Sequence, residues 1–520
     1  MGTGASMGTR MNPVPIIDLF AGPGGLGEGF SSLCDSKGRR RFRIALSIEK
    51  DPSARQTLRL RAFFRQFPRG EVPEEYYAHL AGRVSETELW ESHPDEAASS
   101  DAEAWLAELG SSATPDSEID RRISQGLGTA ARWVLIGGPP CQAYSLVGRS
   151  RLIGGEGIAR YEADPRHGLY RHYLRIIARH RPSVFVMENV KGLLSAKIGK
   201  QRTFDRILSD LRDPSRAMPR AAVDTARYRL HALSPGDLDL FGTAEPEDFV
   251  VRAERHGIPQ ARHRVIILGV REDLGGRPGP LPEMKGPSVE DVIGDLPPLR
   301  SGLSHGTDSP DAWAEAIRRI SRSSWMEDGR IAKDVVRAVR RGLEDLRSRS
   351  GRGGDFLPVR PRPRALAEWF CDERLEGITN HSTRGHMEGD LQRYLFSSAF
   401  AAAMGRSPLL DDFPRELLPD HGNVADALEG SKFNDRFRVQ LRDRPSTTVV
   451  SHISKDGHYF IHHDPTQCRS LTVREAARLQ TFPDNYHFKG ARTDQYRQVG
   501  NAVPPLLARR IAEVVSGILP

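Results

Sequence analysis

The tetrapeptide Pro139-Pro140-Cys141-Gln142 is the feature that most constrains this chain. It follows a short apolar run, Trp133 to Ile136, and a glycine pair, a pattern that predicts a buried strand ending in a stiff turn. A thiol presented by such a turn is typical of a nucleophile, whereas most isolated cysteines are small buried apolar groups. A second apolar run, Val184 to Met187, ends in Glu188. A thiol and a carboxyl group, each at the end of a buried strand, suit a nucleophile and an acid.

The start of the chain predicts an α/β fold. Val14 to Leu19 is apolar and leads into a glycine-rich segment, Phe20 to Phe30, and a further apolar run, Ile44 to Ile48, ends in Glu49. The order strand, glycine turn, helix, strand is a βαβ unit, which opens a doubly wound, Rossmann-like sheet. We expect one domain over residues 14–271.

Two segments interrupt the regular pattern. Residues 71–132 are acidic and rich in Ala and Ser, with stretches such as Ala102 to Leu109 that read as helix, so we expect a helical surface insertion there. Residues 272–440 are rich in Pro, Gly, Arg and Asp and show little strand periodicity, which predicts a separate, less regular domain. Within it, Gly351 to Arg364 reads as a flexible basic linker.

Regular structure returns over residues 441–520, which we expect to complete the first domain. Leu471 to Gln480 and Val503 to Ile518 have the pattern of helices, and the second is entered through Gly500-Asn501-Ala502.

Bulk properties bound the class of protein. The formal net charge is +7. The basic residues are mostly Arg, which suits contacts to phosphate and guanine. A coding bias that favours Arg codons would produce the same excess of Arg. The four cysteines lie far apart without a CxxC pair, so we expect reduced thiols and no metal site. No apolar run approaches the roughly 20 residues that span a bilayer. We therefore expect a cytoplasmic protein with no membrane contact.

Six blocks occur in a fixed order along the chain: DLFAGPGGLGEGF, GGPPCQAYS, ENV, PQARHR, RSLTVREAARLQTFPD and QVGNAVPP. In these blocks the chain resembles the DNA cytosine-5 methyltransferases, over residues 14–271 and 444–515. The resemblance implies a Rossmann-like, S-adenosylmethionine-dependent methyltransferase sheet. The middle third carries no family-wide pattern, which is what the family leads one to expect of its target-recognition domain.

The residue types fit the chemistry. Cytosine C5 is a poor nucleophile until a thiolate adds at C6 and turns the ring into an enamine, which can attack a methyl sulfonium. By resemblance, Cys141 is that nucleophile, Glu188 contacts N3 and the exocyclic amine, Arg264 reaches the base's O2, and Arg262 supports the same site.

The resemblance also implies where S-adenosylmethionine binds. Phe20 would pack against it, Gly22 and Gly24 would line its amino-acid end, and Glu49 would bond the ribose hydroxyls, a contact shared with dinucleotide enzymes. The expected set is completed by Pro139, Asn501 and Val503. Asn501 also suits a helix N-cap, and both roles can hold. The aspartate with which the family usually contacts the adenine cannot be placed in this sequence.

The substrate implied is double-stranded DNA, from which the target base must be rotated out. The segment after Cys141 is glycine-rich and reads as a mobile clamp, with Val147 where the family inserts a side chain into the vacated stack. The expected DNA-binding residues are Gln142, Ser145, Val147, Arg149, Gln260 and Arg384. Arg384 suits guanine or phosphate, and equally a surface charge beside a helix cap.

We therefore predict a DNA (cytosine-5-)-methyltransferase that modifies a specific duplex sequence and is of the bacterial restriction–modification type. We expect a restriction endonuclease as its functional partner and association with the nucleoid in the cytoplasm. Two alternatives stay open: an RNA cytosine-5 methyltransferase of the same fold, and a catalytically silent DNA-binding subunit.

Overall fold

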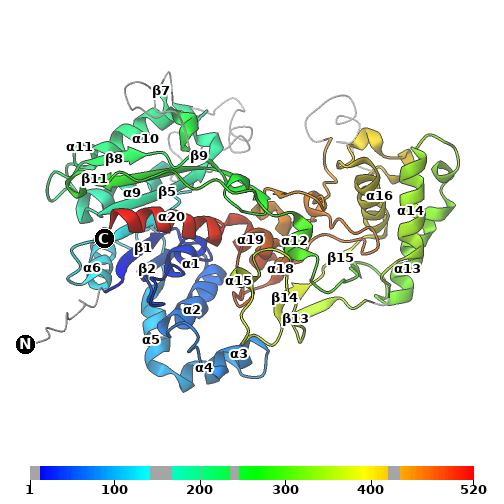
Figure 1. Cartoon of the computed structure of the whole chain (residues 1–520), viewed down its shortest axis with the longest axis horizontal. Coiled ribbons are helices and arrows are strands. Elements are labelled where there is room, and N and C mark those ends of the chain that lie inside the picture. The colour runs from blue at the N-terminus through cyan, green and yellow to red at the C-terminus, as the bar shows by residue number, and fades with distance from the viewer. Residues whose placement is uncertain are drawn as a thin grey trace, which may run out of the picture.

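The structure is a computed structural model that describes residues 12–140, 167–198, 201–234, 245–348, 350–419 and 434–519. Figure 1 shows an elongated molecule, with a larger α/β domain at one end and a smaller, mostly helical domain at the other. The first and last described segments of the chain both lie in the larger domain.

A mixed sheet of eight strands forms the centre of the larger domain. Its order is β3-β2-β1-β4-β5-β11-β8, with β9 also paired to β11. The first five strands run parallel and β11 runs antiparallel to β5. The bounds are β1 Val14–Leu19, β2 Phe42–Glu49, β3 Ala104–Leu106, β4 Val134–Gly137, β5 Val184–Val190, β8 Tyr228–His231, β9 Val250–Arg252 and β11 His263–Arg271. The predicted doubly wound α/β fold is confirmed.

Helices cover both faces of this sheet, which is why its central strands are apolar on both sides. Alternate residues of β1 show the two faces: Ile17 packs in a cluster with α6, α9 and α10, whereas Ile16 packs in a cluster with α1 and α20. The helices of this domain are α1 Gly25–Ser31, α2 Pro52–Gln66, α3 Glu74–Leu80, α4 Glu86–Ser92, α5 Pro94–Glu103, α6 Asp116–Leu127, α9 His167–His180, α10 Thr203–Arg212, α11 Pro214–Ala217, α19 Arg492–Asn501 and α20 Pro505–Ile518.

The smaller domain has a core of its own. Trp313, Trp325 and Phe396 are fully or almost fully buried in one apolar cluster, which also contains Phe437 and, from residues 441–520, Ile461. The helices of the middle region and its junction are α12 Val289–Ile293, α13 Pro310–Arg318, α14 Lys333–Glu344, α15 Ala367–Phe370, α16 Glu388–Met404 and α18 Val473–Leu479. Short two-stranded pairings complete the description: β6 Lys197–Ile198 with β7 Gln201–Arg202, β10 Gln260–Ala261 with β16 Ser446–Thr447, β12 Gly302–Leu303 with β15 Gly385–His386, and β13 Gly353–Leu357 with β14 Ile378–Ser382.

Two local predictions were wrong. The stretch Ala102 to Leu109, expected as helix, contains the end of α5 and then the edge strand β3, in which Ala104 pairs with Ser47. Its Ala, Glu and Leu residues favour helix, but pairing with β2 decides the outcome. The expected flexible linker begins with a real strand, β13, because Phe356 pairs with Thr379 of β14. The remainder of residues 71–132 is largely helical.

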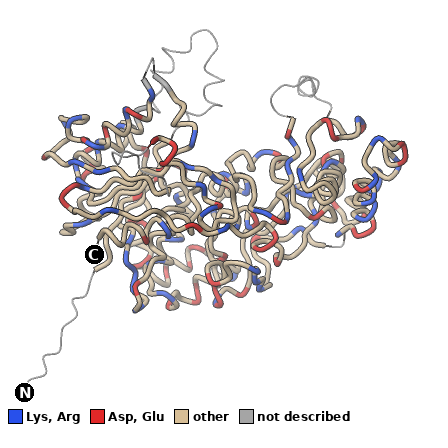
Figure 2. The backbone as a smooth tube through the Cα atoms, turned by 45° about the horizontal axis from the view of Figure 1, so that its top comes forward, with Lys and Arg blue, Asp and Glu red and all other residues tan. Residues whose placement is uncertain are grey.

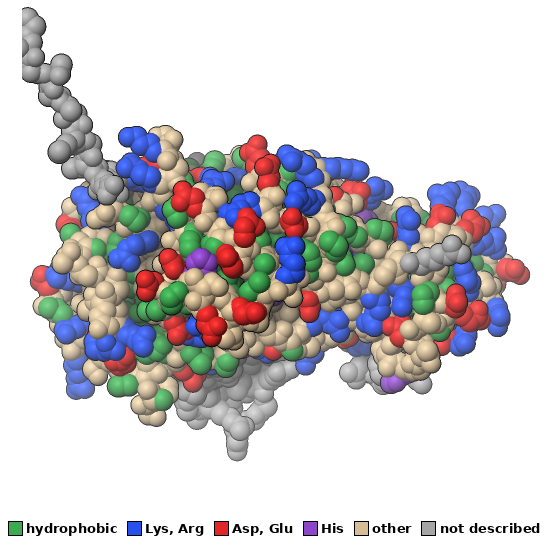
Figure 3. Space-filling model, turned by 90° about the horizontal axis from the view of Figure 1, so that it is seen from below, with side chains coloured by type: hydrophobic (Ala, Val, Ile, Leu, Met, Phe, Trp, Pro, Cys, Tyr) green, Lys and Arg blue, Asp and Glu red, His purple; other side chains and the backbone are tan. Residues whose placement is uncertain are grey.

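Charge is mixed over both domains. Lys and Arg are interspersed with Asp and Glu in each domain (Figure 2), and the face seen from below carries acidic and basic side chains side by side (Figure 3). That face therefore lacks the continuous basic stripe typical of a surface that follows a duplex. Within the described residues, no helix has the length and apolar character needed to cross a membrane, and no group of three metal-ligating side chains occurs there.

The two ends of the chain pack together through a close helix contact. A side-chain carbon at Gly29 of α1 would lie 2.3 Å from the Pro505 carbonyl oxygen and 2.4 Å from the Ala508 side chain of α20. Because both neighbours belong to a helix that is itself packed on the sheet, neither can move aside cheaply.

We predict that Gly29→Ala destabilises the protein by about 1–3 kcal/mol or more through overpacking. The matched control is Gly279→Ala, because nothing lies within 4 Å of a side chain added there. Urea unfolding measures both. Equal free energies of unfolding for Gly29→Ala and the native chain would contradict the close packing of α1 on α20.

A buried carboxyl in β1 gives the stability a pH dependence. Asp18 is 1% exposed, and neither of its side-chain oxygens has a hydrogen-bond partner of normal geometry among the described residues. Burial raises the pKa of Asp18 to about 8, and the nearby Arg65 offsets only part of this effect. Between pH 4 and 8 the folded state therefore keeps a proton that the unfolded state releases, so this group lowers the stability as the pH rises.

We predict that Asp18→Asn removes this loss. The free energy of unfolding of the variant minus that of the native chain should grow between pH 5 and pH 8, by up to about 1.4 kcal/mol per pH unit. Urea unfolding at several pH values measures the difference. A difference that stays constant over this range would show that Asp18 is ionised in the folded protein.

Candidate active site

Five parallel strands reach the same edge of the sheet, and β5 continues beyond it to Val190. The pairing of neighbouring strands places Trp105, Ile48, Leu19, Gly137 and Met187 in a single row across β3, β2, β1, β4 and β5. The residues that follow this row lie at the carboxyl edge of the sheet, where open α/β sheets bind their ligands. The glycine turn, Glu49, the Gly-Pro-Pro turn and Glu188 therefore meet although they are far apart in sequence.

A cavity of about 530 Å³ lies at this edge. The expected site residues that line it are Phe20, Gly22, Glu49, Pro139, Glu188, Arg262, Arg264, Asn501 and Val503. Gly24 belongs to the same turn but does not line the cavity. Pro140, which precedes Cys141 in the sequence, does line it. Cys141, Gln142, Ser145, Val147, Arg149 and the rest of the expected clamp lie outside the described residues.

Glu188 and Arg264 form an ion pair in the cavity wall. The Arg264 Nε lies 2.9 Å from the Glu188 Oε1, and the two side chains are 12% and 15% exposed. Antiparallel pairing of β5 and β11 brings them together, since Arg264 is opposite Val190. Gly138 leaves room for the carboxylate, because a side-chain carbon there would lie 2.8 Å from the Glu188 Oε2.

Backbone groups hold the glycine turn and Glu49 together. The Gly22 N–H donates to the Glu49 Oε2 at 2.8 Å, and the N–H groups of Lys50 and Asp51 donate to its Oε1. Burial raises the pKa of Glu49. The turn needs a glycine at Gly24, where φ is 92°, a left-handed value that other residues rarely adopt. It is also held from outside, because the Tyr486 hydroxyl donates to the Pro23 carbonyl.

Arg262 and Gln260 are directed into the protein. Arg262 is 2% exposed and its Nη1 donates to the Val449 carbonyl at 2.8 Å, so within the cavity wall it joins the PQARHR segment to residues 441–520. Burial, together with the neighbouring Arg264, lowers the pKa of Arg262. Gln260, expected at the DNA, is fully buried: its amide nitrogen donates to the Leu479 carbonyl and its oxygen accepts from the Val449 N–H.

The returning chain closes the other side of the cavity. Asn501 is the last residue of α19 and is exposed at the cavity, so it is not the helix N-cap that the sequence also allowed. A side-chain carbon at Gly25 would lie 2.2 Å from the Val503 carbonyl oxygen. The glycine turn and the QVGNAVPP segment are thus in direct contact.

Arg384 is also used inside the protein. Its guanidinium donates to the carbonyls of Lys455 and Ile453, at 2.6 and 2.7 Å, and lies 4.2 Å from the centre of the Tyr496 ring. Both Nη atoms are therefore engaged without any nucleic acid.

Several residues that line the cavity were not identified from the sequence. Ala107, Glu108 and Leu109 follow β3 and line the cavity next to Glu49, but a three-residue strand among helix-forming residues gives no periodic signal. Asn189 is almost buried and its side-chain N–H donates to the Pro139 carbonyl at 3.2 Å, which ties the ends of β5 and β4 together. The ENV block could have pointed to Asn189, because this amide directly follows Glu188 in the sequence.

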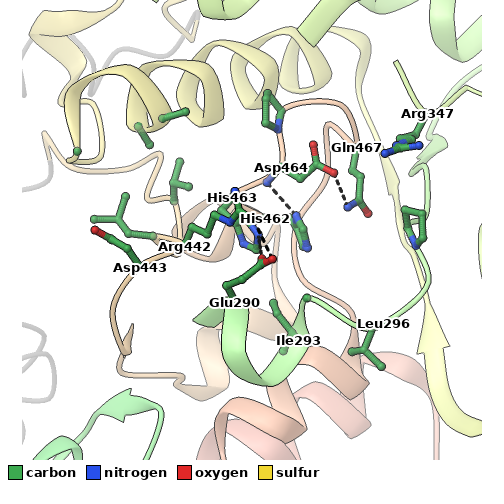
Figure 4. A pocket seen from close by; sticks show the side chains of 18 residues that line it. Glu290, Ile293, Leu296, Arg347, Arg442, Asp443, His462, His463, Asp464 and Gln467 are labelled. Carbon is green, nitrogen blue, oxygen red and sulfur yellow. Dashed lines mark hydrogen bonds and ion pairs between the residues drawn. The ribbon is translucent and has the colours of Figure 1, made fainter. Parts of the chain in front are cut away.

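A second cavity, of about 640 Å³, lies at the junction of the domains (Figure 4). Its charged groups are largely paired with one another: the His463 Nε2 lies 3.1 Å from the Glu290 Oε2, and the Arg442 Nη2 donates to the Glu290 Oε1 at 2.9 Å. It lies away from the strand ends, so we place the candidate chemistry in the first cavity.

Comparison with known proteins agrees with this geometry. A family model of C-5 cytosine-specific DNA methylases matches residues 114–214 and 247–517. The chain is 33% identical to the type II methyltransferase M.Bpa9945I of Bacillus paralicheniformis, over 97% of this chain and 99% of the relative. It is 27% identical to the type II methyltransferase M.AgeI of Thalassovita gelatinovora, over 96% and 98% of the two chains.

Among solved structures, the fold is similar to that of an E. coli prophage protein assigned as a DNA modification methyltransferase. The TM-score is 0.50 at 18% identity, over 97% of this chain and 99% of that chain. The family match and the full-length relatives confirm the resemblance seen in the sequence blocks. The chain belongs to the C-5 cytosine-specific DNA methylases, and it is a DNA methyltransferase that acts on carbon 5 of cytosine.

Proposed function

We propose that the cavity at the carboxyl edge binds S-adenosylmethionine and a cytosine rotated out of duplex DNA, and that methyl transfer takes place between them. The observation that carries this proposal is the arrangement of two chemically different walls in one cavity. The glycine turn and Glu49 form one wall, and the Glu188–Arg264 ion pair forms the other.

The first wall fits S-adenosylmethionine. Glu49 presents a carboxylate at the end of β2, the position from which a ribose can be bonded, and the glycine turn lets the backbone approach a ligand closely. Asn501 and Val503 would close the methionine end, and the Ala107–Leu109 segment next to Glu49 would cover the adenine. Bound there, S-adenosylmethionine supplies an electrophilic methyl group on a sulfonium.

The second wall fits the Watson–Crick edge of cytosine. Protonated, the Glu188 carboxyl can donate to N3, and its other oxygen can accept from the exocyclic amine. Arg264 can donate to O2 while it stays in contact with Glu188. Arg262 acts indirectly, because its hydrogen bond to Val449 holds the wall on which these groups stand.

Cys141 supplies the nucleophile. Its thiolate forms a bond to C6, which makes C5 nucleophilic, and C5 then takes the methyl group as the bond to the sulfonium sulfur breaks. A base removes the C5 proton, and the thiolate leaves as the double bond re-forms. Proton donation by Glu188 at N3 stabilises the ring as the thiolate adds, so this carboxyl contributes mainly to the rate of the chemical step.

We further propose that residues 14–271 and 441–520 together form the catalytic domain and that residues 272–440 form the target-recognition domain. The helix contact between α1 and α20 supports the first grouping, and the separate core around Trp313 supports the second. The type II relatives support a role beside a restriction endonuclease of the same sequence specificity, in the cytoplasm of a bacterium where DNA is the substrate.

The proposal is tested by following tritium from labelled S-adenosylmethionine into duplex DNA and, separately, into transfer RNA. We expect label in C5 of cytosine in DNA only. Label in RNA only would overturn the proposed substrate.

In the same assay we predict that Glu188→Gln lowers kcat at least about 100-fold, because the amide cannot donate a proton to N3. Binding of S-adenosylhomocysteine, measured by calorimetry, should change little, since Glu188 belongs to the other wall. Glu290→Gln is the control, because Glu290 pairs with His463 at the domain junction. A Glu188→Gln variant with native kcat would contradict the role of this carboxyl.

A further inference from the structure

One short turn separates the active-site cavity from a cavity in the smaller domain. Val450 and Ser451 line the active-site cavity, and the next residue, His452, lines another cavity of about 540 Å³. Consecutive Cα atoms are about 3.8 Å apart, so the two cavities lie on either side of the same turn. Because they share this turn, the second cavity is a candidate contact for base pairs next to a cytosine held in the first. We call the second the outer cavity; its lining includes Asp390, Arg393, Arg436, His452, His458 and Tyr459.

Most polar groups of the outer cavity are already engaged. Arg393 donates to Asp390 and to the Leu417 carbonyl. His458 lies 2.7 Å from the Tyr394 hydroxyl through its Nδ1. These side chains therefore build the cavity and have little hydrogen-bonding capacity left for a ligand.

Three side chains of the outer cavity are different. Within the part of the chain that the structure describes, the Arg436 guanidinium, the His452 ring nitrogens and the Tyr459 hydroxyl have no hydrogen-bond or ion-pair partner. The His452 and Tyr459 rings meet edge to face, with centres 5.7 Å apart, which fixes them relative to each other. Burial and the nearby Asp435 raise the pKa of Tyr459, so its hydroxyl keeps its proton and can donate.

These groups have the chemistry of base reading. An arginine with a free fork can donate to both O6 and N7 of a guanine in the major groove, and donors on an imidazole or a phenol can reach the acceptors of adjacent bases. Phosphate contacts carry no sequence information, so the effect of these residues on sequence preference distinguishes base reading from phosphate binding.

Arg384 holds the turn that carries this set. Its two hydrogen bonds end on Ile453 and Lys455, just after His452, and its guanidinium lies on the Tyr496 ring of α19. The turn leaves through Gly457, where φ is 83° and a side-chain carbon would lie 2.6 Å from the Ser470 side chain. The position of the turn is thus fixed from both sides.

We propose that Arg436, His452 and Tyr459 form a base-reading site for the duplex next to the target cytosine, and that Arg384 is a positioning residue that holds the turn carrying it. The inference rests on the proposed function and deepens it. It assigns to Arg384 an internal role in place of the DNA contact expected from the sequence.

The test uses the full-length protein, S-adenosylmethionine and a duplex library with randomised bases on both sides of one cytosine, read by bisulfite sequencing. The native chain should methylate one sequence context. Arg436→Ala and His452→Ala should each relax the preference at particular positions, with discrimination reduced about 10- to 100-fold there. Tyr459→Phe, which removes only the hydroxyl, tests the same site with minimal disturbance of packing.

Arg442→Ala is the matched control, because this arginine lies on the same returning segment but pairs with Glu290 at the domain junction. It should leave the sequence context unchanged. Arg384→Ala should relax the same positions as His452→Ala and raise KM for DNA more than it lowers kcat. Arg384→Lys keeps the charge but not the two-nitrogen fork, so it should recover only part of the discrimination.

The outcomes separate the two proposals. If the native chain methylates a defined context and the Arg436, His452 and Tyr459 variants keep that context, base reading at the outer cavity is overturned while the proposed function stands. A uniform loss across all contexts would assign these residues to phosphate and would also overturn it. If the native chain methylates no cytosine in any duplex of the library, the proposed function itself is overturned.

Discussion

The shared register of five parallel strands at one edge of the sheet is the constraint on which the rest of the structure depends. Leu19 pairs with Gly137 and Gly137 with Met187, so the residues after each strand open into one cavity. A slip of one residue in β4 or β5 would turn every side chain of that strand to the opposite face of the sheet. Glu188 would then point away from the glycine turn. Apolar packing on both faces of β1, β4 and β5 stabilises this register. A slip would exchange the side chains that pack in the two clusters along the whole strand.

A second constraint is that the cavity is assembled from both ends of the chain. The buried pair Arg61–Glu28 joins α2 to the helix that follows the glycine turn, and Arg61 also donates to the Asn485 side chain of the returning segment. Tyr486, the next residue, holds the Pro23 carbonyl. Buried charges of this kind are costly unless fully satisfied, which explains why they occur in a bidentate, hydrogen-bonded cluster. The glycine turn thus depends on residues more than 450 positions away in sequence.

The sequence predicted the sheet and much of the cavity because each central strand is a continuous apolar run with a distinctive ending. Glu188 and Glu49 could be placed from such endings alone. β3 could not, since three residues among good helix formers carry no period and only pairing with β2 makes them a strand. Gln260 and Arg384 were expected at the DNA and Arg262 at the base, but the burial and hydrogen-bond partners that the structure shows for them are properties of the folded chain. The residues of the outer cavity could be identified only from the folded structure, because their spacing in the sequence forms no recognisable pattern.

The central claim is that this cavity performs chemistry through a bond between Cys141 and the pyrimidine ring. Duplex DNA with 5-fluorocytosine at the target position tests it directly, because the fluorine cannot leave as a proton does and the bond persists. With S-adenosylmethionine present, mass spectrometry should find the methylated DNA strand joined to the peptide that contains Cys141, and Cys141→Ala should give no adduct. A native chain that methylates ordinary DNA but forms no adduct, or forms it at another residue, would contradict the account.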